Sequence, residues 1–174
     1  MASRPKLSEL KLDEKEWPEL RRLKVSARRG WEYAGMILRE IYKNYGAEGI
    51  RRCFNSVMCM QAEKYFLPTL KALDIKGNDC KTVASYFILA DIIAFPGFEG
   101  FEVIEDSPRR VVLRAHQCPF SKDPAKDFPV GICENSMGHE QTAAKLVDPK
   151  MRFFCTKFMS RGDPYCEMGF EIEN

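Results

Sequence analysis

Four of the seven cysteines stand where a folded chain would turn or start a new element. They are Cys118, Cys133, Cys155 and Cys166. Zinc binds about four soft ligands in a tetrahedron, and thiolates from separate elements can supply them. The spacing matches no close-paired zinc knuckle, so packing of the thiols in the core stays open as the alternative.

The other cysteines, Cys53, Cys59 and Cys80, fall in segments of helical periodicity and are interpreted as core or surface residues. An odd number of cysteines in a chain expected to be cytoplasmic argues against a disulfide framework, because that compartment keeps thiols reduced. Core packing, metal binding and reactive chemistry remain as roles for the thiols.

Three more side chains could move protons. His116 stands two residues before Cys118, so both should project to the same side of their strand. His139 and Glu140 follow Cys133, which is expected to begin a helix whose N-terminus favours the thiolate. Either residue could act as a general base, and a neutral imidazole is the better proton acceptor near pH 7. An exposed helix surface is the alternative interpretation of this GHEQ stretch.

Helices dominate the first half of the chain. A first helix is expected to start near Trp31 and to end at Gly46, and a second should span 47–73. Asp79 is a suitable N-cap for a third. These helices would form a layer that covers the rest of the domain.

The hydrophobic period then changes from helical to alternating. Strands are expected at 101–105 and 110–117, and again at 150–159 and 165–173, with a helix from Cys133 between the two hairpins. The order predicts an α+β fold in which an N-terminal helical layer packs on an antiparallel sheet of two hairpins.

Alternation in the last strand places Cys166 on the inner face of the sheet. A turn between Arg161 and Gly162 would set Lys157 opposite Cys166 and Cys155 opposite Met168. The two thiols would then be diagonal neighbours, roughly 7 Å apart at the backbone.

Length and composition bound the protein class. The chain has 174 residues, of which 45% are hydrophobic and 30% charged, with a net charge of +2. These values indicate a single domain at 29–174 behind a charged N-terminal arm at 1–28, and nothing in them indicates nucleic-acid binding. The longest apolar run, YFILADIIAF, is about half of the ~20 residues that a membrane-spanning helix needs. We therefore expect a cytoplasmic protein that does not bind membranes.

Three stretches, IYKNYGAEGIRR, GFEGFEVIEDSPRRVVLRAHQCPF and FFCTKFMSRGDPYCEMGFEI, carry a family resemblance. They resemble the L-2-amino-thiazoline-4-carboxylic acid hydrolase-like family and the related 4-vinyl-reductase-type small-molecule-binding domains. The resemblance covers roughly 38–173. Its sharpest motifs are Cys118-Pro119, the ICEN stretch, and the Gly-Asp-x-x-Cys that ends at Cys166.

The resemblance implies a helical layer and an antiparallel sheet around an apolar ligand pocket, with a zinc site beside it and frequent dimerisation. Cys118 and Cys166 match the first and last zinc ligands of the sensor branch. The middle pair departs from the pattern, because Cys155 replaces a glutamate and Phe158 replaces a cysteine. Either Cys133 completes the set or the site is lost.

Three functions follow as hypotheses. The favoured one is a hydrolase that opens a small heterocyclic or amidine-type compound by attack of water. A non-catalytic small-molecule-binding module and an accessory subunit with a structural cysteine clip are the alternatives. Two groups of apolar residues are relevant. Candidates for a homodimer surface are Trp31, Tyr33, Ile37 and Tyr42, and candidates for pocket walls are Tyr65, Phe66, Tyr86, Phe87 and Phe95.

Overall fold

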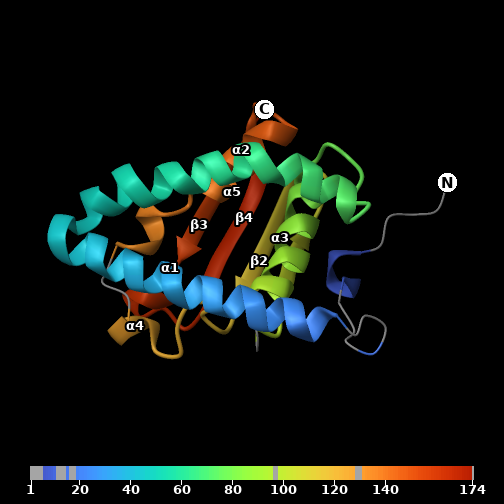
Figure 1. Ribbon diagram of the computed structural model, residues 1–174. Coiled ribbons are helices and arrows are strands. Elements are labelled where there is room, and N and C mark those ends of the chain that lie inside the picture. The colour runs from blue at the N-terminus through green and yellow to red at the C-terminus, as the bar shows by residue number, and fades with distance from the viewer. Residues whose placement is uncertain (1–5, 11–14, 16–18, 96–97, 128–130, 174) are drawn as a thin grey trace.

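The computed structural model describes residues 6–10, 15, 19–95, 98–127 and 131–173 (Figure 1). Its elements follow the order η1 (Leu7–Glu9), α1 (Leu20–Gly49), η2 (Ile50–Phe54), α2 (Asn55–Ala72), α3 (Cys80–Ala94), β1 (Glu102–Asp106), β2 (Arg110–Ala115), α4 (Pro124–Asp127), η3 (Cys133–Asn135), α5 (Gly138–Val147), β3 (Met151–Lys157), η4 (Met159–Arg161) and β4 (Cys166–Ile172). This order of helices and hairpins confirms the predicted α+β fold. None of the described helices combines the length and the apolar character needed to cross a membrane.

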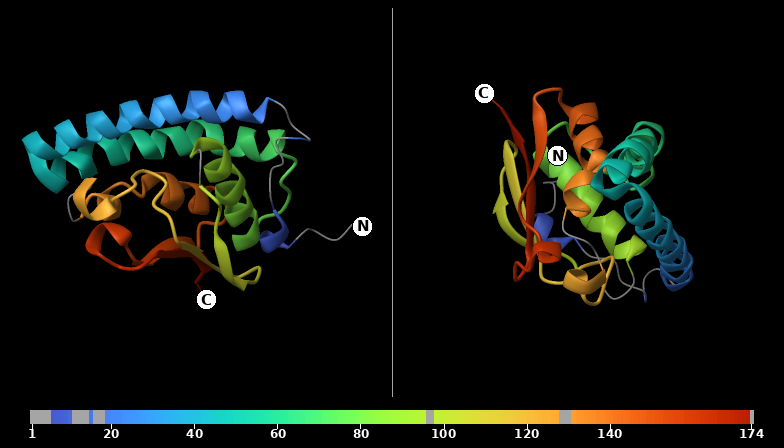
Figure 2. Two further views of the ribbon diagram at one scale, coloured as in Figure 1. Left: turned by 90° about the horizontal axis from the view of Figure 1, so that it is seen from below. Right: turned by 90° about the vertical axis from the view of Figure 1, so that its left-hand side faces the viewer.

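The sheet is antiparallel throughout, with the strand order β1-β2-β4-β3. Helices cover one of its faces only, as the right-hand view of Figure 2 shows. In this order β4 lies between β2 and β3. β3 carries Cys155, and Cys118 follows the end of β2.

Strands β2 and β4 approach each other closely at Gly169. A Cβ atom there would lie 2.1 Å from the carbonyl oxygen of Val111 and 2.7 Å from the ring of Phe154. Only glycine fits this position, because both neighbours are held by the sheet.

The register of β3 against β4 confirms one half of the sequence prediction and corrects the other. Cys155 lies opposite Met168 as predicted, but Lys157 lies opposite Glu167 and not opposite Cys166. An irregularity between Cys155 and Lys157 shifts the pairing by one residue.

Local chemistry sets the predicted helix boundaries. The backbone leaves helical geometry at Gly46, where φ is 62°, and the chain then continues through the π-helical turn η2 into α2. Asp79 caps α3 as predicted, since its carboxylate accepts a hydrogen bond of 3.0 Å from the N–H of Thr82. These stops allow α1 and α2 to run in opposite directions over the sheet (Figure 1).

The main core lies between the sheet and helices α3 and α5. Phe87 of α3 stacks on Phe170 of β4 with ring centroids 5.5 Å apart, and Met151 of β3 and Ala144 of α5 are also fully buried. Helix α2 packs on the outer side of α5, and α1 packs on α3. Layering of this kind buries α3 on most of its circumference.

Two predicted boundaries differ in the structure. β2 ends at Ala115, so His116 and Cys118 follow the strand and strand alternation does not orient them. Cys133 forms the 3-10 turn η3, and the longer helix α5 begins only at Gly138. The expected helix N-terminus at Cys133 is therefore absent from the described structure.

The range expected to form the N-terminal arm is only partly described. Within it, α1 already begins at Leu20, and Leu7 of η1 is 1% exposed and belongs to the main core. The backbone N–H of Leu7 also donates to Asp106 of β1. Leu7 thus ties this segment to the domain.

Leu7→Ala should lower the free energy of unfolding by about 2–5 kcal/mol, because it removes a fully buried side chain and leaves a cavity. Urea denaturation measures the change. Leu23→Ala is the matched control, since Leu23 is 42% exposed on α1, and it should change stability by less than about 1 kcal/mol. Equal, small effects of both substitutions would contradict the anchoring role of Leu7.

Candidate functional site

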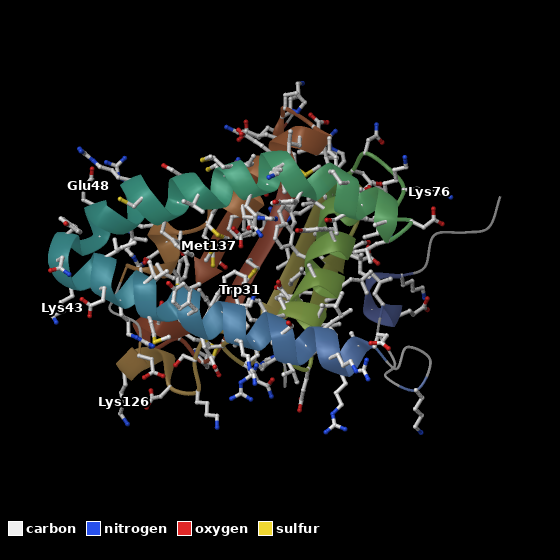
Figure 3. All side chains as sticks on the ribbon, in the orientation of Figure 1. Trp31, Lys43, Glu48, Lys76, Lys126 and Met137 are labelled. Atoms are coloured by element: carbon white, nitrogen blue, oxygen red, sulfur yellow. The ribbon has the colours of Figure 1, made fainter. Side chains whose placement is uncertain are left out.

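A pocket of about 760 Å³ opens between α1, the end of α3 and the 116–122 segment. Its aromatic wall is formed by Trp31, Phe95 and Phe120, whose ring centroids lie 4.9–5.2 Å apart in pairs. Figure 3 labels Trp31 on α1, where the helix passes over the strands. This volume is typical of a site for a small organic ligand.

Cys118 and Met159 form part of the pocket lining. The pocket therefore includes one of the four cysteines that the sequence analysis selected. We call Cys118, Cys133, Cys155 and Cys166 the cysteine corner. The N–H of Met159 donates to the Sγ of Cys166 at 3.4 Å, so η4 touches both the pocket and the cysteine corner.

The structure brings all four cysteines together. Besides burial, which is the largest cause, the charge of Cys166 raises the pKa of Cys118, of Cys133 and of Cys155, and the charge of Cys133 also acts on Cys155. Such interactions weaken with distance, so the four thiols lie in one region of the protein. Their convergence on a shared metal ion stays a prediction.

Burial sets the protonation of the thiols in this corner. It raises the pKa of Cys133 to about 11 and that of Cys155 to about 12, and it also raises the pKa values of Cys118 and Cys166. All four are therefore protonated thiols near pH 7 when no cation is bound. The expected low-pKa thiolate at Cys133 is wrong, because the thiol is partly buried in the short turn η3 and does not lie at the N-terminus of a long helix.

Within the described ranges, no three Cys, His, Asp and Glu side chains form a group arranged to hold a metal ion. The thiols are close, but they are not preset in a coordination shell. Metal binding would need both loss of thiol protons and a local adjustment of side chains.

Two carboxyl groups outside the pocket lining are partly buried, those of Glu140 in α5 and Asp91 in α3. Glu140 of α5 has an Oε2 atom that is buried without a hydrogen-bond partner. Burial is the largest cause of the raised pKa values of Cys155 and Asp91, and the charge of Glu140 is a further cause at both. Sequence reasoning selected Glu140 but missed Asp91, which stands in an otherwise apolar helical stripe.

Burial changes the protonation of both acids. It raises the pKa of Glu140 to about 7, and it raises the pKa of Asp91 well above its ordinary value, with the charge of Glu140 as the second cause. A carboxyl group whose pKa is raised to about 7 exists in both its protonated and its charged form near neutral pH. The pair can therefore both donate and accept a proton.

His139 precedes Glu140 on α5, and both of its ring nitrogens are engaged in hydrogen bonds. Its Nδ1 is 3.0 Å from Oε1 of Gln61, and its Nε2 is 3.1 Å from the hydroxyl of Tyr86. The amide oxygen only accepts, so Nδ1 carries the proton and Nε2 accepts from Tyr86. Burial lowers the pKa of His139 to about 4. These contacts suit a positioning role better than the role of general base predicted from sequence.

His116 lies at the rim of the pocket, away from the carboxyl pair. Its Nε2 is 2.8 Å from the carboxylate of Glu102, and both side chains are at least half exposed. Among the aromatic residues predicted to line a pocket, only Phe95 does so. Tyr65 is exposed, while Phe66, Tyr86 and Phe87 belong to the core. Helical periodicity could not separate these cases, since pocket wall and core share one helix face.

Comparison of the sequence with models of protein families and with curated proteins gives no match. The site must therefore be interpreted from its own geometry.

Glu140→Gln should raise the free energy of unfolding at pH 8 by roughly 1–3 kcal/mol, because the wild-type protein buries a charge there. The pKa of Glu140 is about 7 when folded and 4.5 in its ordinary state, so the neutral group favours folding below 4.5 and this advantage is lost as the pH rises through 7. The gain should shrink as the pH falls over this window. Urea denaturation at pH 8 and pH 5 tests this.

Glu63→Gln on the exposed face of α2 is the matched control and should have little effect at either pH. A loss of stability in Glu140→Gln that is equal at both pH values would mean that the carboxylate makes a required hydrogen bond, contrary to the unpartnered state of its Oε2 atom.

Proposed function

We propose that the protein is a cytoplasmic hydrolase that acts on a C–N bond of a small heterocyclic or amidine-type compound. One observation carries the proposal. Glu140 has a buried, unpartnered oxygen and a pKa of about 7, and its charge raises the pKa values of Asp91 and Cys155. A carboxyl group with a pKa near the working pH is suited to general acid–base catalysis.

The path from the pocket to the acids runs along α3. Ala94 and Phe95 line the pocket, and Asp91 stands three and four residues before them, on the same side of the helix. Asp91 therefore lies about one helical turn from the pocket wall. Movement of Phe95, or binding of a small ring against it, would bring a ligand toward Asp91.

Ring opening by water needs one proton removed and one delivered. In the proposed reaction, the charged carboxyl of the pair takes a proton from water as the water oxygen bonds to the amidine carbon. The protonated partner then donates a proton to the ring nitrogen as the C–N bond breaks. Water is consumed, and the proton count of the pair is restored when the two groups exchange a proton.

His139 and Tyr86 would position the acids through their helices, because their hydrogen bond joins α5, which carries Glu140, to α3, which carries Asp91. Tyr86 has its pKa raised to about 12 by burial, with the charges of Asp91 and Glu140 as further causes, so its hydroxyl stays neutral and donates to His139. In this proposal both residues are positioning residues.

The proposal includes a structural zinc ion. The donor set of the cysteine corner suits it, since four thiols from separate elements match the preferred ligands of a structural zinc ion. Cys118, Cys133, Cys155 and Cys166 would hold the ion and so join the loop after β2, η3, β3 and β4. A zinc ion with four protein ligands lacks a position for water, so the proton chemistry is assigned to Glu140 and Asp91.

The second candidate is a non-catalytic binding module, which the open aromatic pocket favours because its walls need no chemistry to hold a ligand. The family resemblance noted in the sequence is consistent with either candidate.

Glu140→Gln should lower kcat for ring opening of small cyclic amidines or thiazolines by roughly 10²-fold or more, because the amide cannot exchange a proton. The rate of ring opening is measured as the rate at which the product appears. Glu63→Gln is the matched control. The same substitution should make the protein more stable at pH 8, which separates lost chemistry from lost folding. Should His139→Ala abolish turnover while Glu140→Gln retains it, the histidine would be the base instead. A wild-type protein that turns over none of these compounds favours the binding module.

Native mass spectrometry should find about one zinc per chain in protein purified anaerobically without chelator, and less in Cys118→Ser and Cys166→Ser. Cys53→Ser is the control, because Cys53 is exposed and lies outside the cysteine corner. Metal-free wild-type protein would rule out the zinc.

The same spectra report assembly. We propose a homodimer through α1, where Tyr33 is 65% and Ile37 is 42% exposed, whereas Trp31 and Tyr42 pack inward. Ile37→Asp should then shift dimers to monomers.

A further inference from the structure

The pocket carries an excess of positive charge. Arg28, Arg39 and Lys122 line it, and the only carboxylate in the described lining is that of Glu32. Glu32 is paired with Arg28 at 2.9 Å. Among the residues that the structure describes, neither Arg39 nor Lys122 has an ion-pair partner. Two cations of the lining thus remain uncompensated, whereas the chain as a whole is nearly neutral.

One stripe of α1 faces this pocket. It consists of Arg28, Trp31, Glu32, Gly35, Met36 and Arg39. Spacings of three and four residues keep these side chains on one side of the helix. Arg28 and Arg39 thereby frame Trp31 and Gly35 from the two ends of the stripe.

Gly35 keeps the middle of the stripe open. A Cβ atom built there would meet no atom within 4 Å. Glycine inside a helix costs roughly 1 kcal/mol relative to alanine, and here close packing does not require it. The missing side chain instead leaves space in front of the aromatic wall.

We propose that this pocket binds a planar aromatic anion. The rings of Trp31, Phe95 and Phe120 would contact the flat body of the ligand, and Arg39 with Lys122 would bind its anionic group. An arginine suits a carboxylate because its guanidinium can donate two parallel hydrogen bonds. This inference goes beyond the proposed hydrolysis, since it concerns recognition at the pocket mouth and holds whether or not a bond is broken.

Calorimetric titration with three isosteric probes tests the proposal. The probes are 2-naphthoate, 2-naphthamide and 2-naphthamidine, which carry a negative, a neutral and a positive end group on the same ring. Naphthoate should bind the wild-type protein roughly 10-fold or more tightly than the amide, because a charge-assisted hydrogen bond replaces a neutral one. The amidine should bind most weakly. An equal or reversed order would overturn the proposal, as would the absence of naphthoate binding at millimolar concentration.

Variants assign the effect to the pocket. Arg39→Gln should raise the Kd for naphthoate roughly 10-fold and leave that for naphthamide unchanged. Arg29→Gln removes the same charge from α1 outside the pocket lining and should have little effect. Glu32→Gln should lower the Kd for naphthoate, because it removes the only described carboxylate of the lining and releases Arg28. A gain of affinity cannot come from misfolding, so failure of Glu32→Gln to improve binding counts against the proposal.

Gly35→Leu should abolish binding of all three probes by filling the open space, and it should not destabilise the helix. Gly30→Leu is the matched control, because Gly30 also has no atom within 4 Å of a built Cβ but does not line the pocket. Naphthoate has no C–N bond, so its binding is measured independently of the proposed hydrolysis. The two proposals can therefore fail separately.

Discussion

Phe87 of α3 stacks on Phe170 of β4, at the centre of the layer between helices and sheet. This contact sets the depth and rotation of α3, and α3 carries Tyr86 and Asp91 and leads directly into Phe95. The rotation that buries Phe87 turns Tyr86 toward His139 and leaves Phe95 at the pocket wall. Core packing and the geometry of the candidate site therefore depend on one helix–sheet contact.

Burial at this layer has opposite effects on apolar and ionisable groups. It stabilises the fold through the apolar core, but it penalises the charged forms of Glu140, Asp91 and the thiols of the cysteine corner. A buried carboxyl oxygen without a hydrogen-bond partner lowers the free energy of unfolding. Such a loss is typical of sites that use the group for chemistry or binding.

Basic side chains line the pocket, whereas an acidic side chain lies beyond its wall. Arg39, Lys122 and the neutral thiol of Cys118 line the pocket, and Asp91 lies about one helical turn from Phe95 of its wall. A ligand that reached both would meet cations at one end and carboxyl groups at the other, which gives the site a direction.

Much of the fold followed from local sequence alone. Alternation in β4 set the inner face with Cys166 and Phe170, Gly46 ended the first helical stretch, and Asp79 capped α3, because each of these depends on neighbouring residues only. The pairing of Cys155 with Met168 was also predictable, since it depends only on the turn between β3 and β4. Local pattern failed at Cys133, where a 3-10 turn replaces the start of a helix, and at Lys157, where an irregular residue shifts the register.

The tertiary structure alone decided the protonation and partners of the site residues. His139 and Glu140 are adjacent in sequence, yet one is held by Gln61 and Tyr86 from two other helices and the other keeps an unpartnered oxygen. The sequence alone does not distinguish Asp91 from an exposed acid on a helix surface. The packing of α5 on α3 makes the difference. The reason is physical: desolvation and charge coupling act over a few ångströms in space, and periodicity along the chain carries no information on which distant groups supply them.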